Sequence, residues 1–390
     1  MSFLSYIIWD VNPSVFSFSE IPRWYGLLFA LGFLISQQVM FYLYRKEGKP
    51  EKDVETLTIF MVVATIIGAR LGHVFFYEPE KYLAHPIDIL KIWEGGLASH
   101  GAAVGILFGL WLYTKYEIKI KFFWIIKDLI GIPIGIKSKK IKREGQNYFQ
   151  VVDRIVIVVA ITGCLIRFGN FMNSEIYGIP TGSNYGVLFA KNVENVFMSD
   201  SSPIEKLTIK KDASRQPNDK GYVPVILDLD FKNQSEILTE ASLTKYLEGR
   251  FSSIVTNYSY VNEHVVLPES KLDYTIKKAA DGHFQADVKA FGIVRHPTQL
   301  YESFTTLAIG LLLFLIWVKY KKDTPPGLLL GLFLVLLFGL RFVHEMFKVN
   351  QVAFENNMEF NMGQLLSIPL IIAGIIIFIR AIRMLPKKQP

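Results

Sequence analysis

The segment Gly327-Leu-Leu-Leu-Gly-Leu-Phe-Leu-Val-Leu-Leu-Phe-Gly-Leu-Arg-Phe-Val-His-Glu-Met-Phe347 is apolar over most of its length. A helix needs about 20 mostly apolar residues to cross the roughly 30 Å hydrocarbon core of a bilayer. Six further segments meet or approach this requirement. The sequence therefore predicts an all-α polytopic membrane protein with seven transmembrane helices, at residues 24–44, 54–76, 99–116, 151–168, 300–317, 327–347 and 363–382.

The composition agrees with this fold class. Of the 390 residues, 51% are hydrophobic and 20% are charged, whereas an average soluble chain has roughly 25% charged residues. The single cysteine, Cys164, excludes an internal disulfide and a metal site built on several thiolates. The net charge of +7 does not indicate a nucleic-acid partner, because the basic residues lie between the apolar segments.

The basic residues also predict an orientation. The stretches after the first, third, fifth and seventh segments are rich in Lys and Arg. The stretch from Lys115 to Arg143 alone contains nine Lys and Arg residues, whereas the other short connections contain few. Because basic connections stay in the cytoplasm, we expect the N-terminus outside and the C-terminus in the cytoplasm. The first segment lacks the basic start and the cleavage site of a signal peptide, so we expect it to remain as a helix.

One connection, residues 185–290, is polar and much longer than the others. Residues 223–231 and 264–267 are typical of strands and residues 236–246 of a short helix. We therefore expect a small inserted α+β extracytoplasmic domain. The predicted membrane parts on either side of it are residues 1–184 and 291–390.

A second insertion, residues 117–148, is predicted on the cytoplasmic side. Within it, residues 122–136 are expected to form an interfacial or re-entrant helix. His264 and His283 of the long connection are expected to be solvated surface residues, because no other metal ligand lies at a suitable spacing.

Ionisable and amide side chains gather at one predicted depth, near the outer ends of the segments. Such side chains are costly in a membrane and indicate function. Arg70, Arg167, Arg295 and Arg341 predict a pocket for an anionic headgroup, because guanidinium groups match phosphate oxygens. The set comprises Arg23, Tyr25, Arg70, His73, His100, Arg167, Asn170, Asn173, Glu175, Arg295, His296, Gln299, Tyr301, Glu302, Arg341, His344, Glu345, Asn361 and Gln364.

Each of these residues also has a simpler interpretation. Tyr25 suits an interfacial anchor, and Arg341 with Glu345 suits an internal ion pair; these interpretations do not predict convergence at one depth. An alternative function is a transporter or binding protein for an anionic lipid or solute. A transporter predicts internal repeats and polar sites at the midplane, but no repeat is evident and the polar cluster lies near one face.

Six motifs occur in order: Ile21-Pro-Arg-Trp-Tyr-Gly26, Gly68-Ala-Arg-Leu-Gly72, Trp93-Glu-Gly-Gly-Leu-Ala-Ser-His-Gly101, Arg167-Phe-Gly-Asn-Phe-Met-Asn-Ser-Glu-Ile-Tyr-Gly178, Arg295-His-Pro-Thr-Gln-Leu-Tyr-Glu302 and Arg341-Phe-Val-His-Glu345. Together they resemble the prolipoprotein diacylglyceryl transferase family. The resemblance covers residues 20–115, 149–184 and 291–385. Ile166 departs from the pattern, since the family usually has glycine there.

The resemblance implies a bacterial enzyme of the cytoplasmic (inner) membrane. Such an enzyme moves the sn-1,2-diacylglyceryl group from phosphatidylglycerol to the lipobox cysteine thiol of a prolipoprotein. The products are a thioether and glycerol 1-phosphate, in the first step of lipoprotein maturation. The implied partners are phosphatidylglycerol, prolipoprotein signal peptides with a lipobox and the lipid bilayer, with no nucleic acid, metal or other cofactor.

Roles follow from the resemblance as hypotheses. Arg167 and Arg341 would hold the phosphate, with Glu345 orienting Arg341, and His100 would accept the thiol proton. Clustered arginines could instead lower the pKa of the substrate thiol and make a base unnecessary. Tyr25 completes the predicted catalytic set. The predicted phosphatidylglycerol site comprises Arg70, Arg167, Asn170, Asn173, Glu175, Gly178, Arg295, Tyr301 and Arg341.

Overall fold

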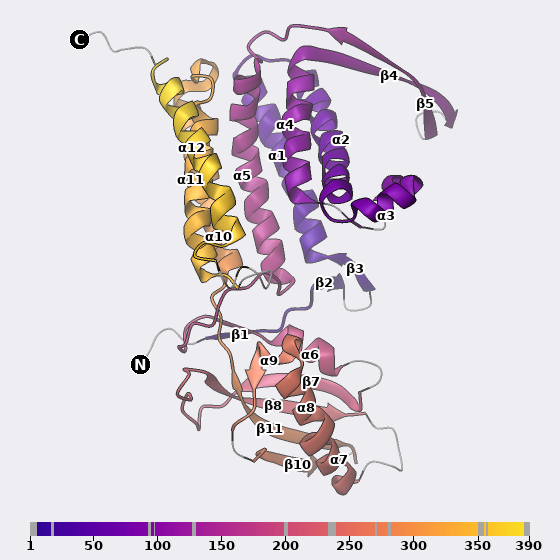
Figure 1. The fold of residues 1–390 in the computed structure, drawn as a ribbon, viewed down its shortest axis with the longest axis vertical. Helices are drawn as coiled ribbons and strands as arrows, with labels where there is room; N and C mark the ends of the chain where they lie inside the picture. Colours follow the sequence, from indigo (N-terminus) through magenta and orange to yellow (C-terminus); the bar gives the residue numbers. More distant parts are fainter. Residues whose placement is uncertain are drawn as a thin grey trace, which may run out of the picture. The chain divides into compact units, whose positions relative to one another are not determined.

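The structure is a computed structural model of the 390-residue chain (Figure 1). It describes residues 6–16, 19–92, 95–96, 98–126, 130–198, 202–232, 239–269, 271–279, 282–349, 355 and 358–385. The chain divides into two compact units. The first unit holds residues 1–31, 164–305 and 340–365, and the second holds residues 32–163, 306–339 and 366–390.

Six helices among the described residues are long and apolar enough to cross a membrane. They are α1 (Trp24–Lys46), α2 (Glu51–Phe76), α5 (Tyr148–Met172), α10 (Thr298–Tyr320, continued by η5, Lys321–Asp323), α11 (Leu328–His344, continued by η6, Glu345–Phe347) and α12 (Met362–Ile382). The remaining predicted segment forms α4 (Ser99–Lys115), which has 17 residues. All seven predicted segments are thus helical, and six have the length and apolarity of a span.

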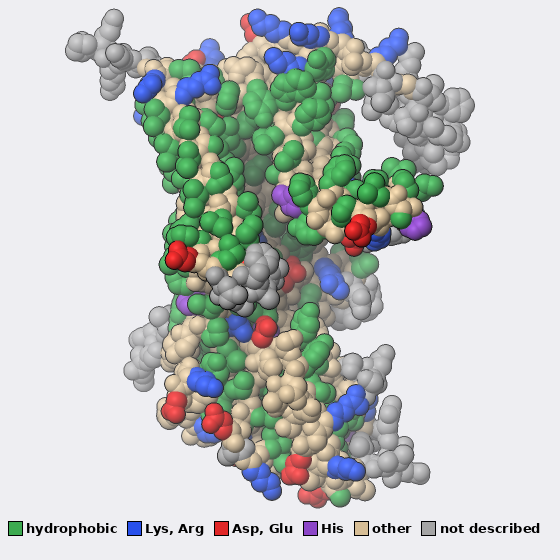
Figure 2. Space-filling model, in the orientation of Figure 1, with side chains coloured by type: hydrophobic (Ala, Val, Ile, Leu, Met, Phe, Trp, Pro, Cys, Tyr) green, Lys and Arg blue, Asp and Glu red, His purple; other side chains and the backbone are tan. Residues whose placement is uncertain are grey.

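The helices expose apolar surface that water would disfavour. In the most apolar 18-residue stretch of α1, only 17% of the residues are buried inside the protein, and the value for α12 is the same. Figure 2 shows hydrophobic side chains along the outward face of α12. Apolar patches of this extent require an apolar surrounding, so the protein is a multi-pass membrane protein.

In the second unit, α2 and α4 pack side by side through small residues (Figure 1). A methyl group added at Gly72 would lie 2.6 Å from the Cα atom of Gly101, and one at Gly68 would lie 2.8 Å from the Cα atom of Gly105. Glycine permits this close approach of membrane helices. The Gly68–Gly72 motif therefore joins two helices.

We expect the substitution Gly72→Leu to destabilise the α2–α4 contact. The atoms nearest to the added group include the α4 backbone, which cannot move aside as a flexible side chain would. Such overpacking costs about 1–3 kcal/mol or more. Thermal unfolding of the detergent-purified protein measures this loss. Gly339→Leu is the matched control, because no atom of a neighbouring helix lies within 4 Å of a methyl group added there. An equal loss in both variants would contradict the packing.

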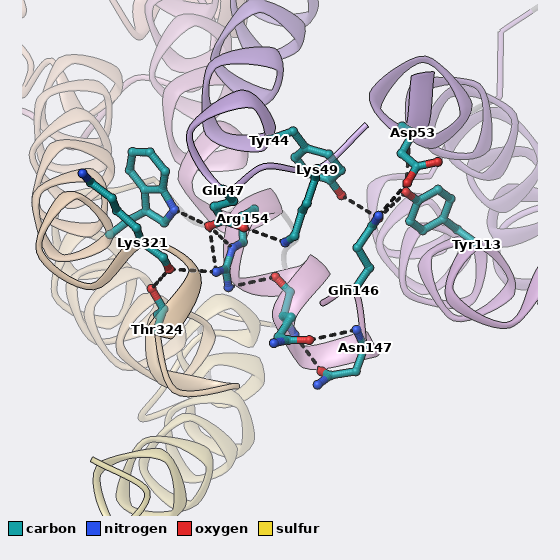
Figure 3. A network of polar contacts seen from close by, with 12 residues as sticks. Tyr44, Glu47, Lys49, Asp53, Tyr113, Gln146, Asn147, Arg154, Lys321 and Thr324 are labelled. Carbon is teal, nitrogen blue, oxygen red and sulfur yellow. Dashed lines mark hydrogen bonds and ion pairs between the residues drawn. The ribbon is translucent and has the colours of Figure 1, made fainter. Parts of the chain in front are cut away.

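A buried ionic network lies at one end of the second unit (Figure 3). Arg154 of α5 donates to Glu47 Oε1 at 2.9 and 2.8 Å and to the Lys321 carbonyl at 3.0 Å. Lys49 and Trp317 each contact the Glu47 carboxylate at 2.6 Å. Burial alone would raise the pKa of Glu47, but the charges of Arg154 and Lys49 hold it below its usual value. The network therefore joins α1, α5 and the end of α10.

The basic insertion is a hairpin. Strands β4 (Tyr116–Ile126) and β5 (Ile130–Lys140) are antiparallel, with Tyr116 opposite Lys140. The predicted helix at residues 122–136 is therefore wrong, although residues 127–129 lie outside the described residues. The physical reason is the alternation of Ile and Lys over residues 118–121, whose period of two favours a strand.

The first unit contains an antiparallel sheet in the order β10-β11-β8-β7, with β9 also pairing with β11. Its strands are β7 (Ile204–Lys211), β8 (Val223–Phe231), β9 (Val265–Val266), β10 (Tyr274–Lys278) and β11 (Phe284–Gly292). The helical pieces are α6 (Ala190–Phe197), α7 (Glu240–Tyr246), η4 (Leu247–Phe251), α8 (Ser252–Asn257) and α9 (Ser259–Asn262). Figure 1 shows them beside the sheet, and both contribute to one apolar core.

Residues near the N-terminus complete the first unit. Strand β1 (Ile7–Trp9) pairs in parallel with β6 (Val187–Phe189), and β2 (Ser14–Phe16) pairs with β3 (Ser19–Arg23) just before α1. The rings of Trp9 and Phe171 are 4.2 Å apart. The end of α5 is thereby packed against β1.

The structure tests several predictions for the long connection. The predicted strand at 223–231 is confirmed as β8, and β9 falls within the predicted strand at 264–267. The predicted helix at 236–246 is observed from Glu240, while residues 236–238 lie outside the described part. The prediction that His264 is solvated is wrong, because it is completely buried next to the core residues Val261 and Val265.

Candidate active site

Helix α5 is followed by a turn with a strained backbone, Ser174–Ile176, which we call the signature turn. Ser174 and Ile176 have φ angles of 55° and 58°, in the left-handed region that non-glycine residues rarely adopt. Each such residue costs roughly 1–3 kcal/mol and persists only where its surroundings hold it. Glu175 lies between them, so its position depends on what stabilises the turn.

Side chains bind every carbonyl group of the signature turn. The Ser174 carbonyl accepts a hydrogen bond from Asn192 Nδ2 at 3.1 Å. The Glu175 carbonyl accepts one from Gln299 Nε2 at 2.7 Å, and the Ile176 carbonyl accepts one from Thr298 Oγ1 at 3.2 Å. Thr298 and Gln299 open α10, whereas Asn192 belongs to α6. Residues far apart in the sequence therefore stabilise the strained backbone together.

Unpaired amide oxygens lie around Glu175. Its carboxylate accepts a hydrogen bond from Asn170 Nδ2 at 2.8 Å and a longer one from Asn173 Nδ2 at 3.5 Å. Among the described residues, Asn170 Oδ1, Asn173 Oδ1 and Gln299 Oε1 are buried and have no hydrogen-bond partner. Buried acceptors are rarely left unpaired, so these three are suited to donor groups of a ligand.

Five charged side chains of the first unit alternate in sign. We call them the charge row: Arg167, Glu302, Lys348, Glu345 and Arg341. Arg167 Nε lies 2.7 Å from Glu302 Oε2. Lys348 Nζ lies 2.5 Å from Glu302 Oε1 and 3.1 Å from Glu345 Oε1. Arg341 Nε lies 3.6 Å from Glu345 Oε1, so one row links α5, α10 and α11.

The two ends of the charge row are its most accessible residues. The side chains of Arg167 and Arg341 are 27% and 42% exposed, whereas that of Lys348 is 5% exposed. Within the part of the chain that the structure describes, the terminal nitrogens of both arginines have no hydrogen-bond partner. Because the row has three cations and two carboxylates, it carries a net positive charge that favours an anion.

Helix α12 leaves space for one carboxylate of the row. A methyl group added at Gly363 would lie 2.6 Å from Glu345 Cδ. Asn361 Nδ2 lies 3.4 Å from Glu345 Oε2. The start of α12 therefore fixes the carboxylate that pairs with Arg341.

Two residues of the predicted lipid site have partners in the backbone. Arg295 is 5% exposed and donates to the Glu263 carbonyl at 3.0 and 2.6 Å and to the Gly178 carbonyl at 3.1 Å. Gly178 donates to the His296 carbonyl at 2.9 Å and forms a β-bridge with Lys348. Arg295 therefore organises this segment, and Gly178 allows the close approach that places Lys348.

Both predicted tyrosines belong to the first unit. Tyr25 packs against Gly169, where an added methyl group would lie 3.0 Å from Tyr25 Cα, so Tyr25 lies beside Asn170. The Tyr301 hydroxyl lies 3.1 Å from His296 Nδ1. Burial lowers the pKa of His296, which favours its neutral form.

Arg70 belongs to the second unit and is 4% exposed. Helix α2 is followed by α3 (Pro79–Ala84) and η1 (Pro86–Leu90). The side-chain nitrogens of Arg70 donate to backbone carbonyls of η1 and of the residues that follow it. The accepting residues are Asp88, Ile89, Lys91, Gly95 and Gly96. Because these bonds use all three guanidinium nitrogens, Arg70 organises this connection, as Arg295 organises the segment around Gly178.

His100 also belongs to the second unit, where it opens α4. Its ring lies 5.2 Å from that of Phe76 and 5.7 Å from that of Tyr77. The side chain is exposed. Its role as a base stays a hypothesis from the family resemblance.

Two members of the charge row have no role in the sequence hypotheses, although Glu302 belongs to the polar set predicted at the outer ends of the segments. Glu302 ends the Arg295–Glu302 motif, but the motif does not name its partners. Lys348 counts in the sequence only toward the charge of a connection. The available signal was the spacing of Glu345 and Lys348, three residues apart, which places both on one side of a helical turn.

The apolar helices define a multi-pass membrane protein, and its first unit combines a net positive charge row with buried amide oxygens that lack a partner among the described residues. Comparison with known proteins gives the family. The chain matches the family model described as prolipoprotein diacylglyceryl transferase over residues 13–141 and 129–380. It belongs to the prolipoprotein diacylglyceryl transferase family.

Relatives of similar length carry one name, phosphatidylglycerol–prolipoprotein diacylglyceryl transferase. The chain is 31% identical to the relative from Tolumonas auensis over 374 residues, covering 96% of each chain. It is 30% identical to that from Chloroherpeton thalassium, covering 97% of this chain and 96% of the relative. The relative from Porphyromonas gingivalis is 29% identical, with 98% and 97% covered.

Proposed function

We propose that the protein transfers the sn-1,2-diacylglyceryl group of phosphatidylglycerol to the lipobox cysteine of a prolipoprotein. The products are a thioether and glycerol 1-phosphate, in the first step of lipoprotein maturation. The observation that carries the proposal is the charge row beside the unpaired amide acceptors, in a chain whose relatives are named for this reaction. The transporter or binding protein is the less favoured alternative.

The headgroup of phosphatidylglycerol matches the two parts of this site. Its phosphate would bind the terminal nitrogens of Arg167 and Arg341, and these would stabilise the charge that grows on the leaving phosphate. The two hydroxyls of its terminal glycerol would donate to the oxygens of Asn170, Asn173 and Gln299, which have no partner among the described residues. Glu175 orients the two asparagines.

The reaction is a substitution at carbon. The substrate sulfur attacks the diacylglyceryl carbon that bears the phosphate ester, and the carbon–oxygen bond breaks as the carbon–sulfur bond forms. The electron pair leaves on the phosphate oxygen of glycerol 1-phosphate. His100 would take the thiol proton; alternatively, the positive charge of the arginines lowers the pKa of the substrate thiol and water takes the proton. The nucleophile belongs to the substrate, so Cys164 is not required.

The membrane arrangement is part of the proposal. We propose α4 as a seventh span, the N-terminus and residues 185–290 on the periplasmic side, and the C-terminus and residues 117–148 in the cytoplasm of a bacterium. The membrane domain would comprise residues 1–184 and 291–390. The distribution of Lys and Arg between the connections supports this orientation.

Headgroup preference tests the proposed site. We expect transfer from phosphatidylglycerol to a fluorescent lipobox peptide, and transfer about 100-fold slower or less from phosphatidylethanolamine. The ethanolamine headgroup lacks the two hydroxyls and brings an ammonium group toward a positive charge row. The assay uses purified protein in vesicles of each lipid, with a peptide whose cysteine is replaced by serine as the control. Equal rates from both lipids would contradict the site, and binding without transfer would favour the alternative.

A further inference from the structure

Asn192 of α6 joins the segment 185–290 to the signature turn. Its amide nitrogen donates to the Ser174 carbonyl at 3.1 Å. The other two carbonyls of the turn are held from the start of α10. Asn192 therefore contributes the third of three hydrogen bonds to a backbone that is unfavourable without them.

His264 determines which way the Asn192 amide points. Its Nε2 lies 3.1 Å from Asn192 Nδ2. Burial, and then the charge of Arg295, lower the pKa of His264 to about 3, so the neutral ring accepts a hydrogen bond at Nε2. The two N–H groups of the amide are thus used by the Ser174 carbonyl and the ring. A reversed amide would place its oxygen against the Ser174 carbonyl oxygen.

Ring contacts and backbone hydrogen bonds hold His264 in place. It is fully buried, and its ring centroid lies 4.9 Å from that of Tyr177 and 6.4 Å from that of Phe189. Its backbone N–H donates to the Val261 carbonyl at 2.9 Å, and its carbonyl accepts from the Ile293 N–H at 2.7 Å. The hydrogen bond to Asn192 therefore comes from a buried ring in the turn between α9 and β9.

A second link reaches the residue after the turn. The Tyr177 hydroxyl donates to Glu263 Oε2 at 2.8 Å, and Glu263 directly precedes His264 in the chain. Asn192 and Glu263 thus contact the chain on both sides of Glu175. If Asn192 or Glu263 moved, the Glu175 carboxylate would shift relative to the Asn170 amide group, which donates a hydrogen bond to it.

We infer that Asn192 and His264 are positioning residues, through which the segment 185–290 holds the signature turn and keeps Glu175 beside Asn170. The inference rests on the proposed function, because the turn affects the reaction only if Glu175 and Asn170 line the headgroup site. It assigns the segment 185–290 a role in the reaction. Both residues act through Glu175, and neither is a catalytic residue.

Three substitutions test the kinetic consequence. Asn192→Ala removes the donor, and His264→Phe keeps an aromatic ring beside Tyr177 but removes the acceptor. His264→Gln returns a polar group near the position of Nε2. We expect the first two to lower kcat/KM for phosphatidylglycerol about tenfold or more, as small misplacements in a site do. His264→Gln should recover most of the rate, and KM for the lipobox peptide should not change.

A control separates positioning from loss of stability. Leu243→Ala removes a side chain from the same apolar core, where Leu243 is 1% exposed, without a described contact to the signature turn. Assayed below its unfolding temperature, this variant should keep the wild-type kcat/KM. An Asn192→Ala variant as active as the wild type, or a Leu243→Ala variant that loses as much activity, would overturn the inference.

Hydrogen exchange gives a readout that does not need activity. We expect Asn192→Ala to speed exchange in a peptide covering residues 170–178 about tenfold or more, because a local opening of the turn exposes its amides. Leu243→Ala should leave this peptide unchanged. Unchanged exchange in Asn192→Ala would overturn the inference even if the wild type is active. A wild type without transfer would instead overturn the proposed function, and the exchange result would still decide whether Asn192 holds the turn.

Discussion

Replacing Arg167 by alanine is expected to lower kcat for diacylglyceryl transfer about 10²–10³-fold. The substitution removes donors aimed at the charge that develops on the leaving phosphate, and losses of this size follow the removal of one such donor. Arg167→Lys should be nearly as slow. A lysine can still pair with Glu302, but it lacks the two terminal guanidinium nitrogens proposed to bind phosphate.

The measurement is the transfer rate in vesicles of phosphatidylglycerol at saturating peptide. Arg250→Ala is the matched control, because Arg250 is an exposed arginine of η4 and its loss changes the net charge equally. It should keep the wild-type rate. A fully active Arg167→Ala protein would remove Arg167 from the phosphate site while leaving the family unchanged.

Replacing Lys348 by methionine is expected to destabilise the first unit by about 3–5 kcal/mol, the usual cost of removing one partner from a buried ion pair. Lys348 lies between the carboxylates of Glu302 and Glu345, and all three side chains are at most 10% exposed. Without the ammonium group, the two carboxylates lose the cation between them. A lower thermal unfolding temperature in detergent measures the effect.

A second substitution shows whether the cause is charge. Glu302→Gln in the Lys348→Met background removes one of the two carboxylates that lose the Lys348 ammonium group. The double variant should therefore be more stable than Lys348→Met alone, since neighbouring charges in one network are not additive. Its transfer rate should stay low because the charge row is broken. A double variant with the summed losses of both single variants would contradict the ionic account.

The helices could be predicted from the sequence because each depends on a local run of apolar residues. The bounds of β8 could also be predicted, because the alternation of apolar and polar residues in this strand is likewise a local pattern. The partners of the arginines could not be predicted. A guanidinium group suits phosphate and backbone carbonyls alike, and only the structure shows that Arg70 and Arg295 donate to carbonyls while Arg167 and Arg341 keep terminal nitrogens without a described partner.

Three further differences between sequence and structure have physical causes. The apolar run at residues 122–136 by itself predicts a helix, whereas the period of two that precedes it indicates the hairpin of β4 and β5. The polarity of His264 suggests solvent, but its burial depends on contacts with Tyr177 and Asn192, which are distant in the sequence. Lys348 was missed because its partner Glu302 lies on another helix.

The fate of the two halves of phosphatidylglycerol tests the central claim most directly. Purified protein is mixed with lipid that carries one label in its acyl chains and another in its headgroup phosphate, together with the lipobox peptide or its serine counterpart. The account predicts the acyl label on the cysteine peptide only, joined by a bond stable to ester cleavage, and the phosphate label released as glycerol phosphate. Phosphate label on the peptide, or acyl label equally on the serine peptide, would contradict it.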